Sequence, residues 1–325
     1  MKWYKGKRIL ITGGAGFIGS ALAKRLSTLG AKVFVTSRKK NPWRLDGESR
    51  MHILVGDLSS PLFVKRAMRK AAPEIVFHVA SNLDTRQDNT RMDHLLEGTF
   101  GITKNVSLAA STLGVKKFVH IGTIEEYIGG EAPYKESVRE VPISPYSLGK
   151  VFSAYFLQYL GRTTPMKVSI VRPAATFGPA QEFRMLIPNL IKAAIDDTEF
   201  KMNAGMQERD FLFIDDLVDG LLLAPKKQHS SGEIINLGSG KKVPVRKIVE
   251  TIQTITKGKP LVHFGVIPYR KHDTMLTLLD SSKAKKLLGW KPKWPLKQGL
   301  EATVAWYRKH YKATDSHHEK TGRKK

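Results

Sequence analysis

Tyr146 and Lys150 are four residues apart in the stretch 146–160, whose apolar spacing predicts a long helix. Side chains at this spacing lie on one face of a helix, so the phenol and the ammonium would be neighbours. A lysine near a tyrosine lowers the pKa of the phenol and brings it closer to the range that is useful for proton transfer. Such pairs are also common on helix surfaces, so the interpretation depends on their surroundings. One such feature is Thr123, a hydroxyl that follows the predicted fifth strand, 117–122.

A glycine-rich stretch, residues 13–19, follows the apolar run 8–12 and precedes helical spacing that continues to Leu29. The pattern predicts a strand, a tight turn and a helix. Glycine allows backbone angles that other residues resist, and the first turn of a helix offers free N–H groups to a pyrophosphate. We therefore predict a dinucleotide site in which the contacts come from Gly13, Gly16, Phe17, Ile18 and Gly19.

The choice of cofactor depends on the end of the second predicted strand, 31–36. An Asp or Glu there would bind the ribose 2′-hydroxyl of NAD, whereas an Arg suits the 2′-phosphate of NADP. The residues present are Ser37, Arg38 and Lys39, which favour NADP over NAD. In the alternative interpretation Arg38 faces water, and another acid such as Asp57 binds the adenosine end.

Predicted strands and helices alternate along the first half of the chain, and the strands are continuously apolar. This pattern indicates an α/β fold with a doubly wound parallel sheet. We expect residues 1–173 to form a dinucleotide-binding domain, to which 211–240 return. Residues 174–210 and 241–312 would form a smaller C-terminal substrate lobe, and 313–325 a disordered basic tail. The site should lie between the two lobes, at the carboxyl ends of the strands.

The net charge is +25, from 54 Lys and Arg against 29 Asp and Glu. This charge fits either a nucleic-acid-binding protein or a solvated basic surface around an anionic substrate. We favour the second, because no basic cluster is interleaved with aromatic residues along the sequence. The chain has no cysteine and no apolar run of membrane-spanning length, and residues 1–7 leave no room for a signal peptide. We expect a cytoplasmic protein without a metal site.

The phrase TGGAGFIGS at residues 12–20 resembles the extended branch of the short-chain dehydrogenase/reductase superfamily, and the resemblance covers nearly all of 7–311. It implies that Tyr146 is the acid/base, that Lys150 is its electrostatic partner and binds the ribose, and that Thr123 is the hydroxyl partner. Further cofactor contacts that it implies are Asp57, Leu58, Ala80 and Pro173. Members of this family usually dimerise through a four-helix interface, so a homodimer is expected.

Three later segments, 207–211, 215–217 and 288–292, resemble those of nucleotide-sugar epimerases and dehydratases. The resemblance implies that Arg209 and Arg270 bind the pyrophosphate of a nucleotide sugar, a role for which the planar guanidinium is suited. The predicted function is an NAD(P)-dependent modification of a nucleoside-diphosphate hexose by hydride transfer at C4. Which nucleotide and which sugar are bound stays open.

Glu125 bears on the type of reaction. It matches a glutamate of 4,6-dehydratases, which removes the C5 proton, and of sugar decarboxylases. The run Glu125-Glu126-Tyr127 also resembles NADPH-dependent 4-ketoreductases, and a plain exposed acid is a third interpretation. A more distant alternative is a non-catalytic RNA-binding relative, although such proteins commonly lose the Tyr–Lys pair. The chain departs from the family pattern at Ser81, Leu95 and Ala175.

Overall fold

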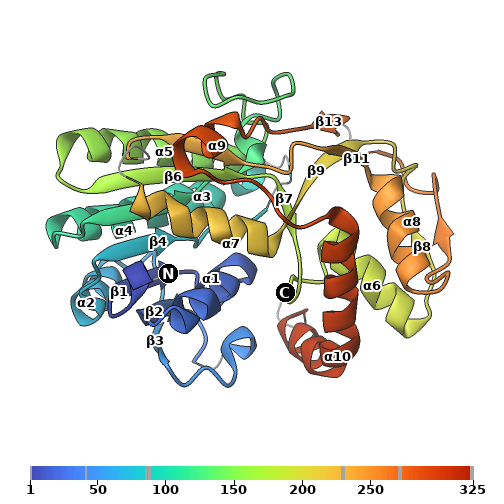
Figure 1. The fold of residues 1–325 in the computed structure, drawn as a ribbon, viewed down its shortest axis with the longest axis horizontal. Helices are drawn as coiled ribbons and strands as arrows, with labels where there is room; N and C mark the ends of the chain where they lie inside the picture. The colour runs from blue at the N-terminus through green and yellow to red at the C-terminus, as the bar shows by residue number, and fades with distance from the viewer. Residues whose placement is uncertain are drawn as a thin grey trace.

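The computed structural model describes residues 2–40, 42–84, 86, 89–227, 231–269 and 273–322, and seven parallel strands form the main sheet of this part of the chain. The order is β10-β6-β5-β4-β1-β2-β3 (Figure 1). It reverses between β1 and β4, which confirms the doubly wound α/β fold. The strands are β1 (Arg8–Thr12), β2 (Lys32–Ser37), β3 (Met51–Val55), β4 (Ile75–His78), β5 (Lys117–Ile121), β6 (Lys167–Pro173) and β10 (Ile234–Leu237).

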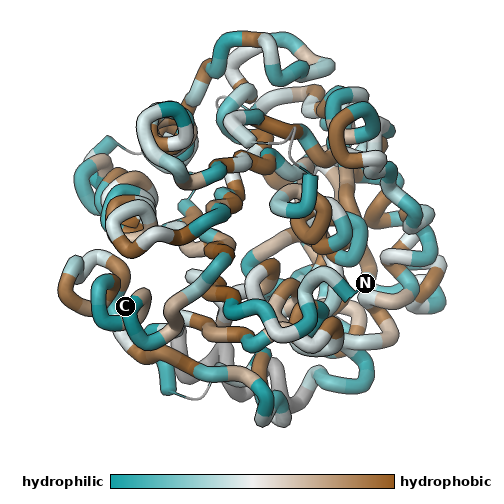
Figure 2. Tube along the Cα trace, turned by 60° about the vertical axis from the view of Figure 1, so that its left-hand side comes forward, coloured by the Kyte–Doolittle hydropathy of each residue, from teal (hydrophilic) through white to brown (hydrophobic). Residues whose placement is uncertain are grey.

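Successive residues of each strand enter two different hydrophobic clusters, because the side chains of a strand point alternately to opposite faces. On β1, Ile9 and Ile11 pack in one cluster, whereas Leu10 packs in the other. Both faces are therefore buried, and hydrophilic residues gather on the outer turns and helices (Figure 2). One face is covered by α1 (Phe17–Thr28) and α7 (Ile214–Leu223), the other by α2 (Pro61–Ala71), α4 (Ile102–Thr112) and α5 (Pro145–Thr163).

The helix that the sequence predicts from Met92 to Leu113 is interrupted in the structure. It consists of α3 (Met92–Leu96), a π-helical segment η4 (Glu97–Gly101) and α4. The backbone N–H of Asn82 donates a hydrogen bond of 3.0 Å to the carbonyl of Gly98. This carbonyl lies in the widened turn, so the loop after β4 is attached to the π-helical segment.

The second lobe contains a smaller sheet of order β11-β9-β13, in which β7 also pairs with β9. A two-stranded sheet joins β8 and β12, and three long helices lie beside them (Figure 1). The strands are β7 (Ala175–Phe177), β8 (Phe200–Lys201), β9 (Glu208–Phe213), β11 (Lys242–Pro244), β12 (Val262–His263) and β13 (Leu276–Thr277). The helices of this lobe are α6 (Leu186–Asp196), α8 (Val245–Ile255) and α10 (Leu296–Gly322), whereas α9 (Ser282–Leu288) packs against β10 and α7. Short 3-10 segments are η1 (Lys2–Tyr4), η2 (Trp43–Leu45), η3 (Asn89–Arg91), η5 (Ile124–Glu126) and η6 (Ala224–Lys226).

Residues 211–240, which the sequence assigns to the first domain, are divided between the lobes. β10 pairs with β6 in the main sheet and α7 packs on α1, but 211–213 belong to β9 of the second sheet. Helix α10 continues to Gly322, although the sequence predicts that order ends near 312. Residues 313–321 contain neither proline nor glycine to interrupt the helix. No helix of the described residues is long and apolar enough to cross a membrane.

Two acids of the later motifs have structural roles. Asp210 is fully buried, and its Oδ1 accepts hydrogen bonds from the backbone N–H of Ser239 at 2.8 Å and from the hydroxyl of Ser239 at 2.6 Å. Asp216 accepts hydrogen bonds from the backbone N–H groups of Lys293 at 2.8 Å and Trp294 at 3.0 Å. The first ties β9 to the turn after β10, and the second ties α7 to the segment before α10.

Candidate active site

The glycine-rich turn lies between β1 and α1, as the sequence predicts. Gly13 has a φ of +68°, and a Cβ there would lie 2.8 Å from the backbone of Ala80. A Cβ on Gly19 would lie 2.2 Å from the carbonyl oxygen of Gly13. No side chain caps α1 at Gly16, so the first N–H groups of the helix, at Phe17 and Ile18, face outward from the turn. The turn therefore has the backbone cradle that a pyrophosphate requires.

The carboxyl ends of four strands bring several predicted residues to the same edge of the sheet. Ala80 follows β4 and contacts the turn after β1, Thr123 follows β5, and Pro173 ends β6. The backbone N–H of Ala80 also donates to the hydroxyl of Thr12 at 3.4 Å. The order of the sheet thus collects residues from positions 12 to 173 at one place.

Arg38, Asp57 and Leu58 lie beyond the neighbouring strands β2 and β3. The backbone N–H of Ser59 donates to Asp57 at 2.9 Å, and this bond, followed by the charge of Arg38, helps to hold the pKa of Asp57 below its usual value. Arg38 is exposed. A cation and an acid therefore stand together where the adenosine ribose of a dinucleotide would lie.

Tyr146 lies in the first turn of α5, where Ser144 caps the helix and Pro145 occupies the first helical position. Its phenol lies near the hydroxyls of Thr123 and Ser81, which act on its pKa, and the residue is 6% exposed. The structure thus brings the predicted Thr123–Tyr146 pair together. It adds Ser81, which sequence reasoning noted only as a departure. The position of Ser81 directly after β4 was the available signal, because that strand lies beside β5 in the sheet.

Lys150 lies one turn further along α5 and is buried. Its Nζ donates a hydrogen bond of 2.7 Å to the carbonyl oxygen of Ile121 and lies 5.9 Å from the ring centroid of Tyr146. Burial lowers the pKa of Lys150 to about 8, and the negative charge of Glu126 opposes this shift. The ammonium therefore titrates near the physiological range.

The pKa of Tyr146 differs from the sequence expectation, because it lies above the usual value of a phenol rather than below it. Burial is the largest cause, the charges of Glu125 and Glu126 add to it, and hydrogen bonds with Thr123 and Ser81 oppose it. The sequence revealed the neighbouring lysine but not the extent to which Tyr146 is buried. Tyr146 keeps its proton in the protein alone.

Glu125 acts electrostatically on residues of both lobes. Its charge raises the pKa of Tyr146 on one side, and on the other it acts on Tyr134 and Arg209. The residue is half-buried, which makes it unlike the fully exposed loop acid considered from the sequence. This carboxylate can act on a ligand that extends from Tyr146 toward Arg209.

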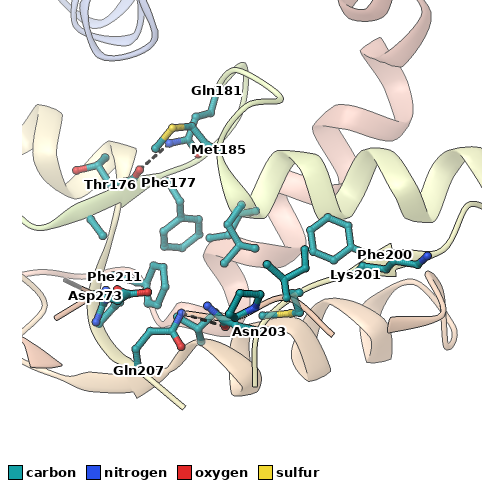
Figure 3. Close-up of a pocket in the computed structure, with 18 residues that line it drawn as sticks. Thr176, Phe177, Gln181, Met185, Phe200, Lys201, Asn203, Gln207, Phe211 and Asp273 are labelled. Atoms are coloured by element: carbon teal, nitrogen blue, oxygen red, sulfur yellow. Dashed lines mark hydrogen bonds and ion pairs between the residues drawn. The ribbon is translucent and has the colours of Figure 1, made fainter. Parts of the chain in front are cut away.

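A cavity of about 510 Å³ opens in the second lobe (Figure 3). Arg209 lines it and is held at 2.8 Å from Asp273. Gln207 also lines it, and among the described residues no hydrogen-bond partner is found for its buried Oε1. Figure 3 shows aromatic walls from Phe177, Phe200 and Phe211. Arg270, the second predicted pyrophosphate ligand, lies outside the described residues.

The three departures from the family pattern have different positions. Ala175 lines the cavity, Ser81 contacts Tyr146, and Leu95 is 1% exposed in the helical layer. In the part of the chain that the structure describes, no three His, Asp or Glu side chains form a group that would hold a metal ion.

Comparisons with known proteins match nearly all of the chain. Residues 9–238 match the model of the NAD dependent epimerase/dehydratase family. A dTDP-D-glucose 4,6-dehydratase of Mus musculus is 28% identical over 321 residues, which cover 94% of this chain and 90% of that protein. A UDP-glucuronate 4-epimerase of Thermodesulfobacterium geofontis is 28% identical over 310 residues, 91% of this chain and 95% of the other.

Two solved structures have the same fold. An epimerase of Methanothermobacter thermautotrophicus has a TM-score of 0.90 and 26% identity, covering 97% of this chain and 96% of its own. A UDP-glucose 4-epimerase of Thermus thermophilus, solved as a complex with NAD, has a TM-score of 0.85 and 25% identity, covering 93% and 99%. With the glycine-rich turn and the Thr123–Tyr146–Lys150 cluster in place, this chain belongs to the NAD-dependent epimerase/dehydratase family of enzymes, the extended short-chain dehydrogenases/reductases.

Proposed function

We propose that this enzyme modifies the hexose of a nucleoside-diphosphate sugar through hydride transfer at C4, as a 4,6-dehydratase or a 4-epimerase. The strongest support is the position of Tyr146, which lies buried near the hydroxyls of Thr123 and Ser81 with Nζ of Lys150 5.9 Å from its ring centroid. Arg209, at the wall of the cavity in the second lobe, lies within electrostatic reach of Glu125, whose charge also acts on Tyr146. A dehydratase and an epimerase are both among the relatives that align with nearly all of the chain.

In this reaction a bound nicotinamide supplies the hydride acceptor and a positive charge beside the phenol. The chain supplies the proton chemistry. Tyr146 takes the proton of the C4 hydroxyl during oxidation and returns it during reduction, and the hydroxyls of Thr123 and Ser81 hold the same oxygen. Lys150 binds the ribose of the cofactor and keeps a cation beneath the phenol. Because Tyr146 is protonated in the protein alone, it is ready to act as the acid, and it becomes the base once positive charge is added nearby.

Glu125 would act at C5. Abstraction of that proton needs a base within hydrogen-bond reach, and the proton becomes acidic only when C4 is a ketone. The half-buried carboxylate between Tyr146 and Arg209 fits this role. A 4-ketoreductase, the second candidate, would need only Thr123, Tyr146, Lys150 and NADPH.

The nucleotide would occupy the cavity of the second lobe. Arg209 and Arg270 would bind its pyrophosphate, with charge-assisted hydrogen bonds that suit phosphate oxygens. Gln207 offers a buried acceptor to a donor group of the ligand, because no described residue satisfies its Oε1.

We also propose that NADP is preferred over NAD. Ser37-Arg38-Lys39 follow β2 where an acid would select NAD, and Arg38 is exposed and able to bind a 2′-phosphate. The competing observation is Asp57, which lies within electrostatic reach of Arg38. Dissociation constants of both cofactors should be measured for the wild type and for Arg38→Ala. An equal affinity of the wild type for NAD and NADP contradicts this preference.

A homodimer would form through α4 and α5. Phe152, Tyr155 and Tyr159 recur at helical spacing on the outer face of α5 and are 43%, 56% and 56% exposed, and Leu108 of α4 is 44% exposed. Aromatic side chains exposed in a row mark an interface. Light scattering on the purified protein tests the mass. Nucleic-acid binding is not expected despite the net charge of +25, and a cytoplasmic location stays a prediction.

The decisive experiment combines turnover in deuterated water with two variants. The wild type is incubated with a panel of nucleotide sugars, with and without added NADPH. Tyr146→Phe should retain cofactor binding and lose turnover by roughly 100-fold or more. If the wild type incorporates deuterium at C5 of the product and Glu125→Gln does not, the result supports elimination. Stoichiometric consumption of NADPH without C5 deuterium supports the ketoreductase, and a fully active Tyr146→Phe enzyme refutes the assignment.

A further inference from the structure

Arg172 of β6 lies completely buried behind the loop that carries Thr123. Its Nε donates a hydrogen bond of 2.8 Å to Glu126, its Nη2 lies 2.7 Å from Glu140, and its Nη1 donates to the phenol of Tyr127 at 2.5 Å. The guanidinium also lies 4.5 Å from the ring centroid of Tyr127. Glu126 is fully buried as well. The proposed reaction uses none of these charges.

The second carboxylate oxygen of Glu126 reaches the catalytic loop. Its Oε1 accepts a hydrogen bond of 2.8 Å from the backbone N–H of Thr123, while the hydroxyl of Thr123 accepts one of 3.2 Å from the N–H of Glu125. These reciprocal bonds form a capping box around η5. The loop that presents Thr123 and Glu125 to the ligand is therefore closed by Glu126, and Glu126 is in turn held by Arg172.

Gly122 makes room for this arrangement. A Cβ at this position would lie 2.4 Å from Oε1 of Glu126 and 3.0 Å from Cγ of Arg172. The ion pair thus fills the space directly beneath the end of β5. It is part of the wall of the active site and not a distant surface bridge.

The charge of Glu126 also faces the proton-transfer residues. This charge opposes the lowering of the pKa of Lys150 by burial. It also contributes to the raised pKa of Tyr146. The other titratable groups that act around Lys150 are His78 of β4 and His120 of β5, whose pKa values are low because of burial and then the lysine charge. Both imidazoles are therefore neutral at physiological pH, and Glu126 is the acid that interacts with Lys150.

A buried ion pair is seldom a net source of stability, since its desolvation cancels much of the attraction. Here two carboxylates, Glu126 and Glu140, surround one guanidinium, and Lys150 supplies the second cation. The two negative charges are matched by two positive charges only when Lys150 is counted together with Arg172. This links the ion pair to the site more closely than packing alone requires.

We propose that Glu126 and Arg172 are positioning residues for the proton transfer. Arg172 fixes Glu126, which closes the Thr123 loop against Tyr146 and supplies the negative charge that faces Lys150. The inference rests on the proposed function only in assigning cofactor binding to Lys150.

The test is the pH dependence of cofactor affinity, which needs no turnover. Glu126→Gln keeps the size of the side chain and an oxygen for the N–H of Thr123 but removes the charge. Without that charge Lys150 should lose its proton at lower pH, so the alkaline loss of cofactor affinity should move down by about one pH unit. Glu140→Gln is the matched control, because it removes a carboxylate from the same arginine and leaves Glu126 in place. Its profile should stay within about 0.3 unit of the wild type.

The variant Lys150→Met distinguishes a failure of the proposed cofactor-binding role of Lys150 from a failure of the proposed role of Glu126. If this variant binds cofactor with an unchanged pH profile, the assignment of Lys150 is wrong and the proposed function fails at that point. If the alkaline loss disappears in Lys150→Met but is unshifted in Glu126→Gln, or shifts equally in Glu140→Gln, the role of Glu126 is refuted. Should Glu126→Gln not fold, Arg172→Met and Glu140→Gln are added to it, so that no charge of the cluster stays buried without a partner; the net change is still the loss of one negative charge, and a downward shift is required of this variant as well.

Discussion

Two arginine–carboxylate pairs, one on each side of Glu125, differ in what surrounds them. Arg172 and Glu126 are both fully buried in the first lobe, whereas the side chains of Arg209 and Asp273 are 19% and 17% exposed at the cavity wall. Burial opposes the charge of Arg172, but Glu126, Tyr127 and further carboxylate contacts hold its pKa above the usual value. The pKa of Arg209 lies below the usual value, because burial outweighs the charges of Asp273 and Glu125.

The two shifts have opposite directions, and we expect this difference to distinguish a structural cation, Arg172, from a ligand-binding one, Arg209. Two carboxylates, Glu126 and Glu140, already pair with the single positive charge of Arg172. Arg209 still gains from further negative charge, and it faces a cavity of about 510 Å³ through which such charge can arrive. A pyrophosphate would supply it, so residue type alone does not assign the role.

The largest expected difference between the two pairs is in stability. Arg172→Met leaves Glu126 and Glu140 buried without their cation, which should reduce the free energy of unfolding by roughly 3–5 kcal/mol. Arg209→Met, at the accessible cavity wall, should change it by less than about 1 kcal/mol. Urea denaturation of both variants measures this. Equal losses for the two would contradict the division into structural and ligand-binding cations.

The sequence predicted the features that depend on local pattern better than those that depend on contacts between distant segments. The apolar strands and the glycine-rich turn determine the main sheet by local pattern, and the bounds of β1 agree with the predicted run 8–12 residue for residue. The π-helical turn after Leu96 is not predicted, because the sequence from Met92 to Leu113 indicates one uninterrupted helix.

In the site, the sequence predicted the residues better than their electrostatics. Thr123, Tyr146 and Lys150 meet as predicted, since they follow strand ends and helical spacing. The partnership of Glu126 with Arg172 depends on the approach of β5 to β6, which no local pattern reveals. The raised pKa of Tyr146 likewise depends on burial by the assembled lobes.

The next expected effect concerns affinity. Arg209→Met should weaken binding of a nucleoside diphosphate by about 10- to 100-fold, the loss expected when a charge-assisted contact is removed. Calorimetric titration with the nucleoside diphosphate alone measures this without turnover. Asp273→Asn is the informative companion, because it removes the carboxylate that a pyrophosphate would replace and should leave the affinity equal or tighter. Unchanged binding by Arg209→Met would remove the cavity from the proposed nucleotide site.

The comparison also extends to two neutral groups, the stacked imidazoles of His78 and His120, whose ring centroids are 5.4 Å apart. His78 is hydrogen-bonded to Thr12 at 2.7 Å and to Thr103 at 3.0 Å, whereas neither ring nitrogen of His120 has a partner among the described residues. Burial is the main cause that lowers both pKa values, that of His78 to about 3. Both histidines are therefore neutral in the folded protein and protonate more readily when it unfolds.

Because the folded pKa values are depressed, this stability is fully present above the unfolded pKa of about 6.5 and is lost as the pH falls toward 3. Each histidine should contribute a slope of about 1.4 kcal/mol per pH unit within that window. His120→Leu should remove one such slope and leave stability near pH 7 equal or higher, since no described hydrogen bond is lost. His78→Leu should remove the same slope but lower stability near pH 7 by about 1–2 kcal/mol, because the hydroxyls of Thr12 and Thr103 each lose one of their hydrogen bonds. Denaturation between pH 4 and 8 compares the two variants, and an unchanged acid slope in His120→Leu would show that this buried imidazole does not titrate with unfolding.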